Sequence, residues 1–114
     1  MAEKAKGRVS ITFMSGPYDG KELFLDQMPI TLGREPHHPV AIFYDLLVSR
    51  NHARIHLDEA GYWVEDTQST NGTLLNEEKI KAKTRLASGD VLQLGNTWLK
   101  FVIPPGISEE EPTK

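Results

Sequence analysis

Short runs of alternating polarity, separated by turn residues, limit the folds open to this chain more than any other feature. Arg8–Met14 places Val9, Ile11 and Phe13 between polar residues, the period of a strand with one buried face. Such runs return every eight to twelve residues or so, and no segment has the apolar spacing of an amphipathic helix. The pattern predicts an all-β fold, an antiparallel β-sandwich of about eleven short strands with no major helix.

Turn residues mark where these strands end. Ser15–Gly20 combines Gly, Pro and Asp-Gly, and Glu59–Gly61 joins two strands as a hairpin. Gly95-Asn96 is a two-residue turn of the kind that hairpins favour. The other expected strands are Lys21–Leu25, Pro29–Gly33, Ala41–Tyr44, Ala53–Asp58, Tyr62–Asp66, Thr73–Leu75, Lys79–Lys81, Thr84–Leu86, Asp90–Gly95 and Thr97–Ile103.

The 114 residues suffice for one domain with a single core. We expect this domain to occupy residues 8–103, after a flexible N-terminus of residues 1–7. Residues 104–114, "PPGISEEEPTK", are acidic and contain prolines, which predicts a disordered tail or linker. Thr113, if phosphorylated, could reach back to a site on the domain; a solvated tail is the simpler alternative.

Composition and charge exclude several classes of function. The net charge of −3 argues against nucleic acid, which needs a basic surface. There is no cysteine for a disulfide, a thiolate metal site or a thiol nucleophile. No apolar run approaches the ~18 residues of a membrane span, and "MAEKAKG" has no apolar signal region. We therefore expect a cytoplasmic monomer that binds neither membrane nor nucleic acid.

Three loops carry unusual chemistry: Gly33–Pro39, Asp45–His52 and Asp66–Thr73. In a sandwich such loops gather at the ends of the sheets, where a rigid scaffold holds them. They contain the residue types for three kinds of site: a nucleophilic triad, a metal centre and an anion pocket.

Ser49, His52 and Asp66 are the residue types of a nucleophilic triad. If a strand begins at Ala53, however, His52 lies at its base and must reach back over Arg50 to touch Ser49. The chain also lacks the Gly-x-Ser-x-Gly elbow. The sequence therefore predicts a protein that is not an enzyme.

Four histidines raise the question of a metal centre. His37 and His38 are adjacent in a loop and are expected to diverge. His52 and His56 share a strand face at a separation of roughly 13 Å, too far to share an ion. We predict no metal and no other cofactor, with His56 exposed on its strand and His52 as a hydrogen-bonding brace of its own loop.

The residues of these three loops fit an anion pocket better than a nucleophilic triad or a metal centre. Arg34 follows Gly33 at a strand end and offers a planar fork of donors that suits a phosphate. Ser49 adds a hydroxyl, and Arg50 adds a backbone N–H and a second cation. The stretch "STNGT" brings further hydroxyls, an amide and a glycine that allows a tight turn. Asp45, Glu65 and Asp66 lie nearby in the sequence and are expected to orient the arginines and cap turns.

The order "GR…VSRNHA…D…STNGT…N…L.SGDVLQLG" resembles the forkhead-associated (FHA) domain, an eleven-stranded β-sandwich that binds phosphothreonine peptides. The resemblance covers about residues 10–103. It implies a module that recognises phosphothreonine in partner proteins, downstream of a Ser/Thr kinase. The alternative is an interaction module of the same fold that does not depend on phosphate.

The resemblance also implies roles for individual residues. Arg34 and Ser49 would contact the phosphate, Arg50 would use its N–H and its side chain, Thr70 would help to hold the phosphothreonine, and Asn71 would bind the peptide backbone beside it. The site would be supported by Gly33, His52, Gly72 and Asn76. Val40-Ala41 and Asn76-Glu77 depart from common family residues, and these departures concern the peptide preference and not the phosphate contacts.

Overall fold

The structure is a computed structural model that describes residues 6–103, with Lys6 and Gly7 described by their backbone alone. Its strands are β1 (Lys6–Phe13), β2 (Glu22–Gln27), β3 (Ile30–Gly33), β4 (Val40–Ala41), β5 (Ala53–Asp58), β6 (Gly61–Asp66), β7 (Thr73–Leu75), β8 (Glu78–Lys79), β9 (Thr84–Leu86), β10 (Val91–Leu94) and β11 (Thr97–Val102). One 3₁₀ turn, Gly16–Tyr18, is the single helical segment in this part of the chain.

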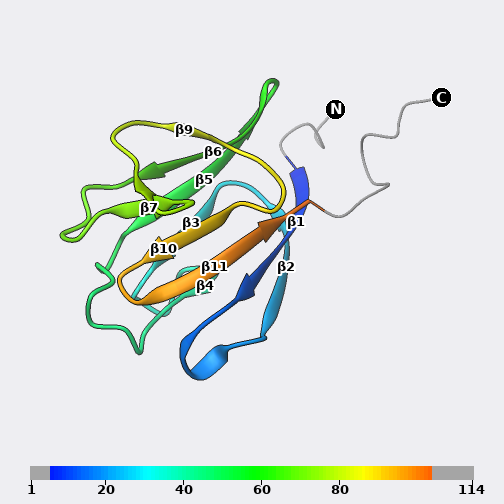
Figure 1. The fold of residues 1–114 in the computed structure, drawn as a ribbon. Helices are drawn as coiled ribbons and strands as arrows, with labels where there is room; N and C mark the ends of the chain where they lie inside the picture. Colours follow the sequence, from blue (N-terminus) through cyan, green and yellow to red (C-terminus); the bar gives the residue numbers. More distant parts are fainter. Residues whose placement is uncertain (1–5, 104–114) are drawn as a thin grey trace.

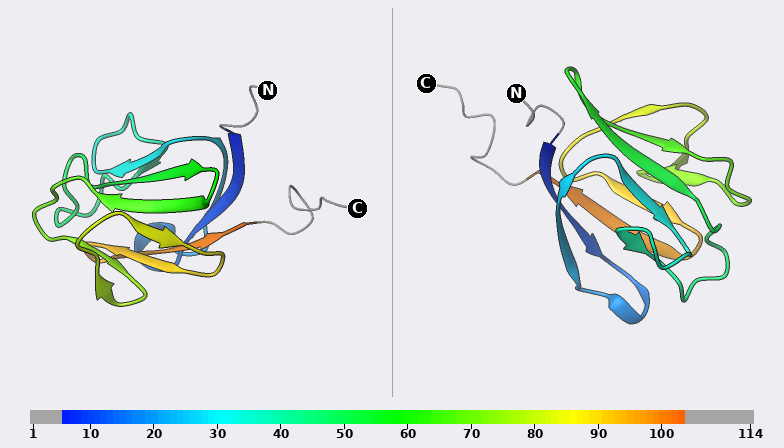
Figure 2. Two further views of the ribbon diagram at one scale, coloured as in Figure 1. Left: turned by 90° about the horizontal axis from the view of Figure 1, so that it is seen from above. Right: turned by 180° about the vertical axis from the view of Figure 1, so that it is seen from behind.

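The strands form two layers (Figures 1 and 2). One sheet has six strands in the order β2-β1-β11-β10-β7-β8, and the other has five in the order β4-β3-β5-β6-β9. The predicted all-β sandwich is confirmed. Among the pairs of the described strands, β3 and β4 alone run parallel, with Leu32 opposite Val40, because the intervening loop carries the chain back beside β3.

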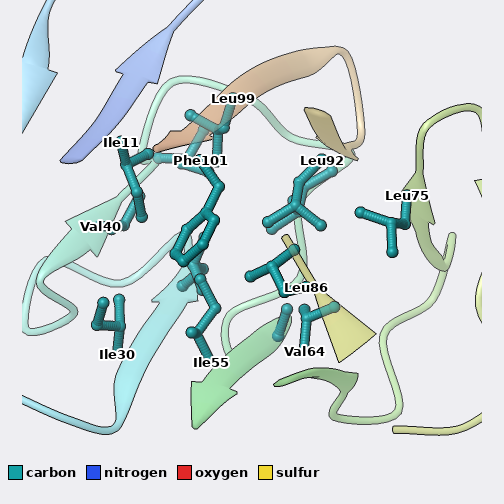
Figure 3. Close-up of a cluster of buried hydrophobic side chains, with 14 of the residues drawn as sticks. Ile11, Ile30, Val40, Ile55, Val64, Leu75, Leu86, Leu92, Leu99 and Phe101 are labelled. Atoms are coloured by element: carbon teal, nitrogen blue, oxygen red, sulfur yellow. The ribbon is translucent and has the colours of Figure 1, made fainter. Parts of the chain in front are cut away.

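The core lies between the two sheets (Figure 3). Strand alternation supplies it: in β11, Thr97, Leu99 and Phe101 are buried, while Lys100 is exposed. From the opposite sheet, Ile55 of β5 points toward Phe101 (Figure 3). A fully buried side chain of this kind stabilises the fold by about 1.5–3 kcal/mol.

The expected strand Ala41–Tyr44 is wrong beyond Ala41. Only Val40–Ala41 pairs as β4, and the chain then turns. Phe43 and Tyr44 instead pack edge-to-face with Tyr18, at ring-centroid distances of 6.0 and 5.5 Å. The short apolar run therefore reflects aromatic packing at the end of the sandwich, which a strand pattern cannot distinguish from pairing.

Two strands begin slightly earlier in the chain than expected. β1 begins at Lys6, two residues before the predicted strand, and β8 begins one residue before Lys79. Residues 1–5 and 104–114, which include Thr113, lie outside the described part of the chain. Within residues 6–103 there is no helix of the length and apolarity that crossing a membrane requires.

The loops after β4 and β6 and the β10–β11 turn gather at one end of the sandwich, away from the start of β1 and the end of β11 (Figures 1 and 2). The predicted hairpin turn at Gly95-Asn96 is confirmed, since Leu94 pairs with Thr97. All three chemically unusual loops of the sequence are linked by hydrogen bonds at this end, as described next.

Candidate functional site

Arg34 follows the last residue of β3 and is fixed in place by the β4–β5 loop. Its backbone N–H donates to Ser49 O at 3.0 Å, and its Nε donates to Val48 O at 2.9 Å. The two Nη groups have no acceptor among the described residues. A bound Nε with free Nη groups holds the guanidinium in one direction and leaves its terminal fork available to a ligand.

Gly33 allows this loop to approach β3 closely. A Cβ at this position would collide with the carbonyl oxygen of Arg50 and would lie 2.6 Å from His38 Nε2. Gly33 is the last residue of β3 and has no positive φ. Its role is to make room for backbone.

His52 is fully buried and joins the β4–β5 loop to the β6–β7 loop. Ser49 N–H donates to its Nδ1 at 3.0 Å, and its Nε2 donates to Gly72 O at 2.9 Å. These two bonds require the neutral ring with hydrogen on Nε2. Burial lowers the pKa of His52 and favours the same form, against smaller opposing effects of the Gly72 hydrogen bond and two nearby carboxylates.

The expected obstacle to a catalytic triad, that His52 would have to reach back over Arg50 to touch Ser49, is wrong in part. His52 does reach Ser49, but it binds the backbone N–H and not the hydroxyl. No hydrogen bond joins His52 to Ser49 Oγ or to Asp66 within residues 6–103. The residues thus lack the hydroxyl-to-imidazole contact that activates a serine.

The β6–β7 loop completes the site. Thr70 N–H donates to Ser49 Oγ at 2.9 Å, and Asn71 Nδ2 donates to Leu47 O at 2.9 Å. Since Ser49 Oγ already accepts a hydrogen bond, its own hydrogen is left to donate elsewhere. In the same way Asn71 keeps its Oδ1 free as an acceptor.

These side chains surround one open hollow of about 260 Å³, here called the loop pocket. It is lined by Arg34, Leu46, Leu47, Val48, Ser49, Arg50, Thr70 and Asn71. All five side chains that the sequence predicted to bind peptide are among them. Two arginines and no carboxylate line the pocket, so it is locally basic although the whole chain carries a net charge of −3.

Asp66 shapes the β6–β7 loop from inside. Its carboxylate accepts hydrogen bonds from Ser69 N–H at 2.9 Å, Ser69 Oγ at 2.6 Å and Thr73 Oγ1 at 2.7 Å. Burial by itself would raise the pKa of Asp66, but these hydrogen bonds outweigh it and lower the pKa. Of the two roles expected for Asp66, orienting the arginines and capping turns, the structure shows the second.

Asp45 connects the loop pocket to the β10–β11 turn. Oδ1 accepts from Leu47 N–H at 3.0 Å, while Oδ2 accepts from Asn96 N–H and Thr97 Oγ1, each at 2.8 Å. Glu65, the third acid expected to orient arginines of the site, pairs with Arg54 on the outer face of the five-stranded sheet. Arg34 is positioned by the carbonyl groups of Val48 and Ser49, and among the described residues no ion pair joins any of these acids to Arg34 or Arg50.

His38 is a supporting residue that sequence analysis missed. It is buried, its Nε2 donates to Arg50 O at 2.7 Å, and its Nδ1 accepts from Thr31 Oγ1 at 2.9 Å. The expectation that His37 and His38 diverge is wrong: their rings lie 4.1 Å apart, and Glu35 brings a third ligand atom to within 4.8 Å of theirs. Both His38 nitrogens are engaged, so a metal here would have to displace one of these bonds.

The remaining supporting residues lie at different distances from the pocket. Gly72 has a φ of +88°, which favours glycine at the end of the β6–β7 loop. Asn76 lies beyond β7 and does not line the pocket. It bonds Asp90 Oδ1 and the N–H of Val91 at 3.0 Å each, and so joins the β7–β8 turn to β10.

Comparison with known proteins gives the family. The FHA domain model matches residues 30–95, which include every residue of the loop pocket. The chain belongs to the FHA domain family. The oxoglutarate dehydrogenase inhibitor of Corynebacterium glutamicum is 34% identical over 99 residues, which are 87% of this chain and 68% of that protein.

Two further similarities support this placement. The glycogen accumulation regulator GarA of Mycobacterium tuberculosis is 33% identical over 105 residues, or 92% of this chain and 64% of GarA. A structure from work on phosphothreonine-dependent FHA domain interactions has a TM-score of 0.75 at 28% identity, over 86% of this chain and 98% of that one. The chain spans about two thirds of the length of the curated relatives. The family and these regulator names indicate a non-catalytic interaction module.

Proposed function

We propose that this FHA domain binds phosphothreonine in partner proteins through the loop pocket, downstream of a Ser/Thr kinase. The observation that carries the proposal is the set of unused donors in one pocket. Arg34 offers its two Nη groups, Ser49 its hydroxyl hydrogen, and Arg50 a backbone N–H with no acceptor among the described residues. A phosphate presents three acceptor oxygens and about −1.5 to −2 charges at neutral pH.

The arrangement suits a ligand that is held and not transformed. Three charge-assisted hydrogen bonds, at about 1.5–3 kcal/mol each, account for much of a micromolar affinity of about −8 kcal/mol. Thr70 lies at the exposed rim beside the phosphate donors, and Asn71 Oδ1 faces no described donor. We assign Thr70 to contacts around the phosphothreonine and Asn71 to the peptide backbone next to it, in a monomeric, cytoplasmic protein without a cofactor.

The deciding experiment compares phosphothreonine, phosphoserine and unphosphorylated forms of one peptide library by fluorescence polarisation. Arg34→Ala is expected to weaken phosphothreonine binding by at least about tenfold, or ~1.4 kcal/mol, with an unchanged melting temperature. Arg8→Ala is the matched control, because it removes the same charge from an exposed position on β1 outside the pocket. Its affinity should change by less than about twofold, the effect of a distant charge.

Binding that ignores the phosphate would contradict the proposal and favour the phosphate-independent module. Equal losses in Arg34→Ala and Arg8→Ala would show that net charge, not the loop pocket, attracts the peptide.

A further inference from the structure

The β3–β4 loop, residues 34–39, brings together three side chains that bind metals in proteins and that the proposed function does not use. One ligand atom from each of Glu35, His37 and His38 lies within 4.8 Å of the other two. None of the three residues lines the loop pocket. Two imidazole nitrogens and a carboxylate oxygen are ligands that zinc and the neighbouring first-row divalent ions prefer. The loop therefore carries the donor set of a metal site.

His38 is already held in the form that binds a metal. Its Nε2 bonds the carbonyl oxygen of Arg50 at 2.7 Å, and the ring is buried. Because a carbonyl can only accept, the neutral ring carries its hydrogen on Nε2 and its lone pair on Nδ1. A histidine ligand in a metal site has this same second hydrogen bond, which fixes the tautomer and the direction of the ring. Nδ1 is therefore the ligand atom that His38 offers.

The competitor for this atom is a hydroxyl group. Thr31 Oγ1 donates to His38 Nδ1 at 2.9 Å, and an ion has to displace it. Thr31 is half-buried, and both residues line a hollow of about 300 Å³, where the displaced hydroxyl can turn to water. The loss is one neutral hydrogen bond, which is small beside a bond between nitrogen and a metal ion.

The spacing of the other two ligands suits a small ion. Ligand atoms in a tetrahedral zinc site lie roughly 3.4 Å apart, since each is roughly 2.1 Å from the ion. His37 Nδ1 and Glu35 Oε1 are 3.7 Å apart, and their side chains are 64% and 42% exposed, so both can turn. The His37 ring lies 4.1 Å from the His38 ring at an angle of 38°. Because an ion lies in the plane of the ring that binds it, His37 has to turn away from His38 on binding.

The backbone of the loop needs no rearrangement. His38 N–H donates to Glu35 O at 3.3 Å, which closes a turn that contains all three ligands. Pro36 lies inside this turn and fixes one of its backbone angles. A turn held in this way loses little conformational entropy when an ion binds.

We infer that Glu35, His37 and His38 Nδ1 bind a divalent transition-metal ion such as Zn²⁺, with water in the fourth position. The ion is a structural clamp: through His38 it ties the β3–β4 loop to the Arg50 carbonyl of the β4–β5 loop. It is not a cofactor that phosphate binding requires, because its ligands lie outside the loop pocket. The inference is independent of the proposed function.

The test is a titration of the untagged full chain with zinc chloride, followed by calorimetry, with magnesium chloride as the comparison. One zinc ion per chain should bind with a Kd below about 10 μM. Magnesium should not bind to these residues, because it prefers oxygen ligands. Nitrogen NMR of the imidazole rings should show a large shift of His38 Nδ1, while the hydrogen on its Nε2 stays in place.

Two variants remove ligands and one serves as a control. His37→Ala and Glu35→Gln should each weaken zinc binding by at least about tenfold, and neither should disturb the fold, since both side chains lie at the surface. His56→Ala is the matched control, because it removes a histidine of β5 that pairs with Glu65 at 3.2 Å outside the cluster. Its Kd for zinc should stay within about twofold of the wild-type value. Zinc should also raise the melting temperature of the wild type and of His56→Ala, but not that of His37→Ala.

The outcomes are distinct. Loss of the zinc site in His37→Ala and Glu35→Gln, with the site kept in His56→Ala, supports the inference. Absence of zinc binding, or binding without a shift of His38 Nδ1, overturns it. Equal weakening in His37→Ala and His56→Ala also overturns it, since the ion is then spread over surface histidines. No phosphopeptide enters these measurements, so their failure leaves the proposed function untouched.

Discussion

Replacing His52 by alanine removes both hydrogen bonds that the imidazole makes between the β4–β5 and β6–β7 loops. The change leaves the Ser49 N–H and the Gly72 carbonyl without their buried partner. Each such group costs about 1–3 kcal/mol, so the unfolding free energy should fall by about 2–6 kcal/mol, before any cost of the cavity. A domain of this size is stable by only about 5–15 kcal/mol, so the variant should be close to unfolding.

The assay is equilibrium unfolding in urea, followed by tryptophan fluorescence from Trp63 and Trp98. His37→Ala is the matched control, because its side chain is 64% exposed and its one ion-pair contact, with Glu35, is 3.7 Å long. The control should change the unfolding free energy by no more than about 0.5 kcal/mol. Equal losses in the two variants would refute the role of His52 as a brace.

The burial of His52 also predicts that the unfolding free energy depends on pH. Burial lowers the pKa of His52 in the folded protein below its ordinary value of about 6.5. The unfolded chain therefore takes up a proton first as the pH falls, and folding loses stability below about pH 6.5 until the pH passes the folded pKa. Protonation would also place hydrogen on Nδ1, facing the Ser49 N–H.

The contribution of His52 to this slope is the difference between the wild type and His52→Ala, since the other three histidines are present in both. The lowered pKa of Asp66 acts in a separate window, because its stabilisation is lost only as the pH falls below about 4. If the unfolding free energies of the wild type and His52→Ala change in parallel between about pH 8 and pH 5, the imidazole of His52 is not held neutral by burial.

Three further variants separate close packing from distant support. Gly33→Ala should weaken phosphopeptide binding and cost about 1–3 kcal/mol of stability, since its Cβ would displace the Arg50 carbonyl. Gly89→Ala, with a φ of +95° and no neighbour within 4 Å of the added Cβ, should cost stability from backbone strain alone and leave affinity unchanged. Asn76→Ala should cost about 1 kcal/mol through its bonds to Asp90 and Val91, with phosphopeptide affinity unchanged within about twofold. A tenfold loss of affinity in Asn76→Ala would place this residue in the site after all.

The sequence was sufficient for the sandwich because alternation reports which face of a strand is buried, and both β5 and β11 follow it. It also placed the pocket side chains in loops that a sandwich gathers at its ends, and the resemblance to the FHA domain supplied the role expected of each. It failed at Ala41–Tyr44, where apolar residues serve aromatic packing in a turn. An apolar run that pairs as a strand and an apolar run that packs in such a turn have the same composition and period. No local feature of the sequence therefore distinguishes them.

The residues that brace the loops from within, such as His38 and Asp45, were harder to predict from the sequence than the residues that face the ligand. His37 and His38 were expected to diverge, as neighbours do in an extended chain. In the structure they lie within a turn that His38 N–H closes by donating to Glu35 O at 3.3 Å. The turn brings the two rings together and buries the His38 side chain. Asp45 and Asn96 are 51 residues apart, and no spacing in the sequence indicates that they meet.

Some hydrogen bonds of the site hold the loops and other polar groups are left for a ligand. This division explains how the pocket keeps its shape when no ligand is bound. Two braces, the buried His52 and the partly buried Asp66, satisfy the loop backbone from within. Arg34 and Ser49 each use one polar group on neighbouring backbone and keep the others available to a ligand. The loops therefore need no phosphate to order them, and little conformational entropy is lost on binding. It follows that a change at Arg34 should alter affinity with little effect on folding, whereas a change at His52 should alter folding first and affinity as its consequence.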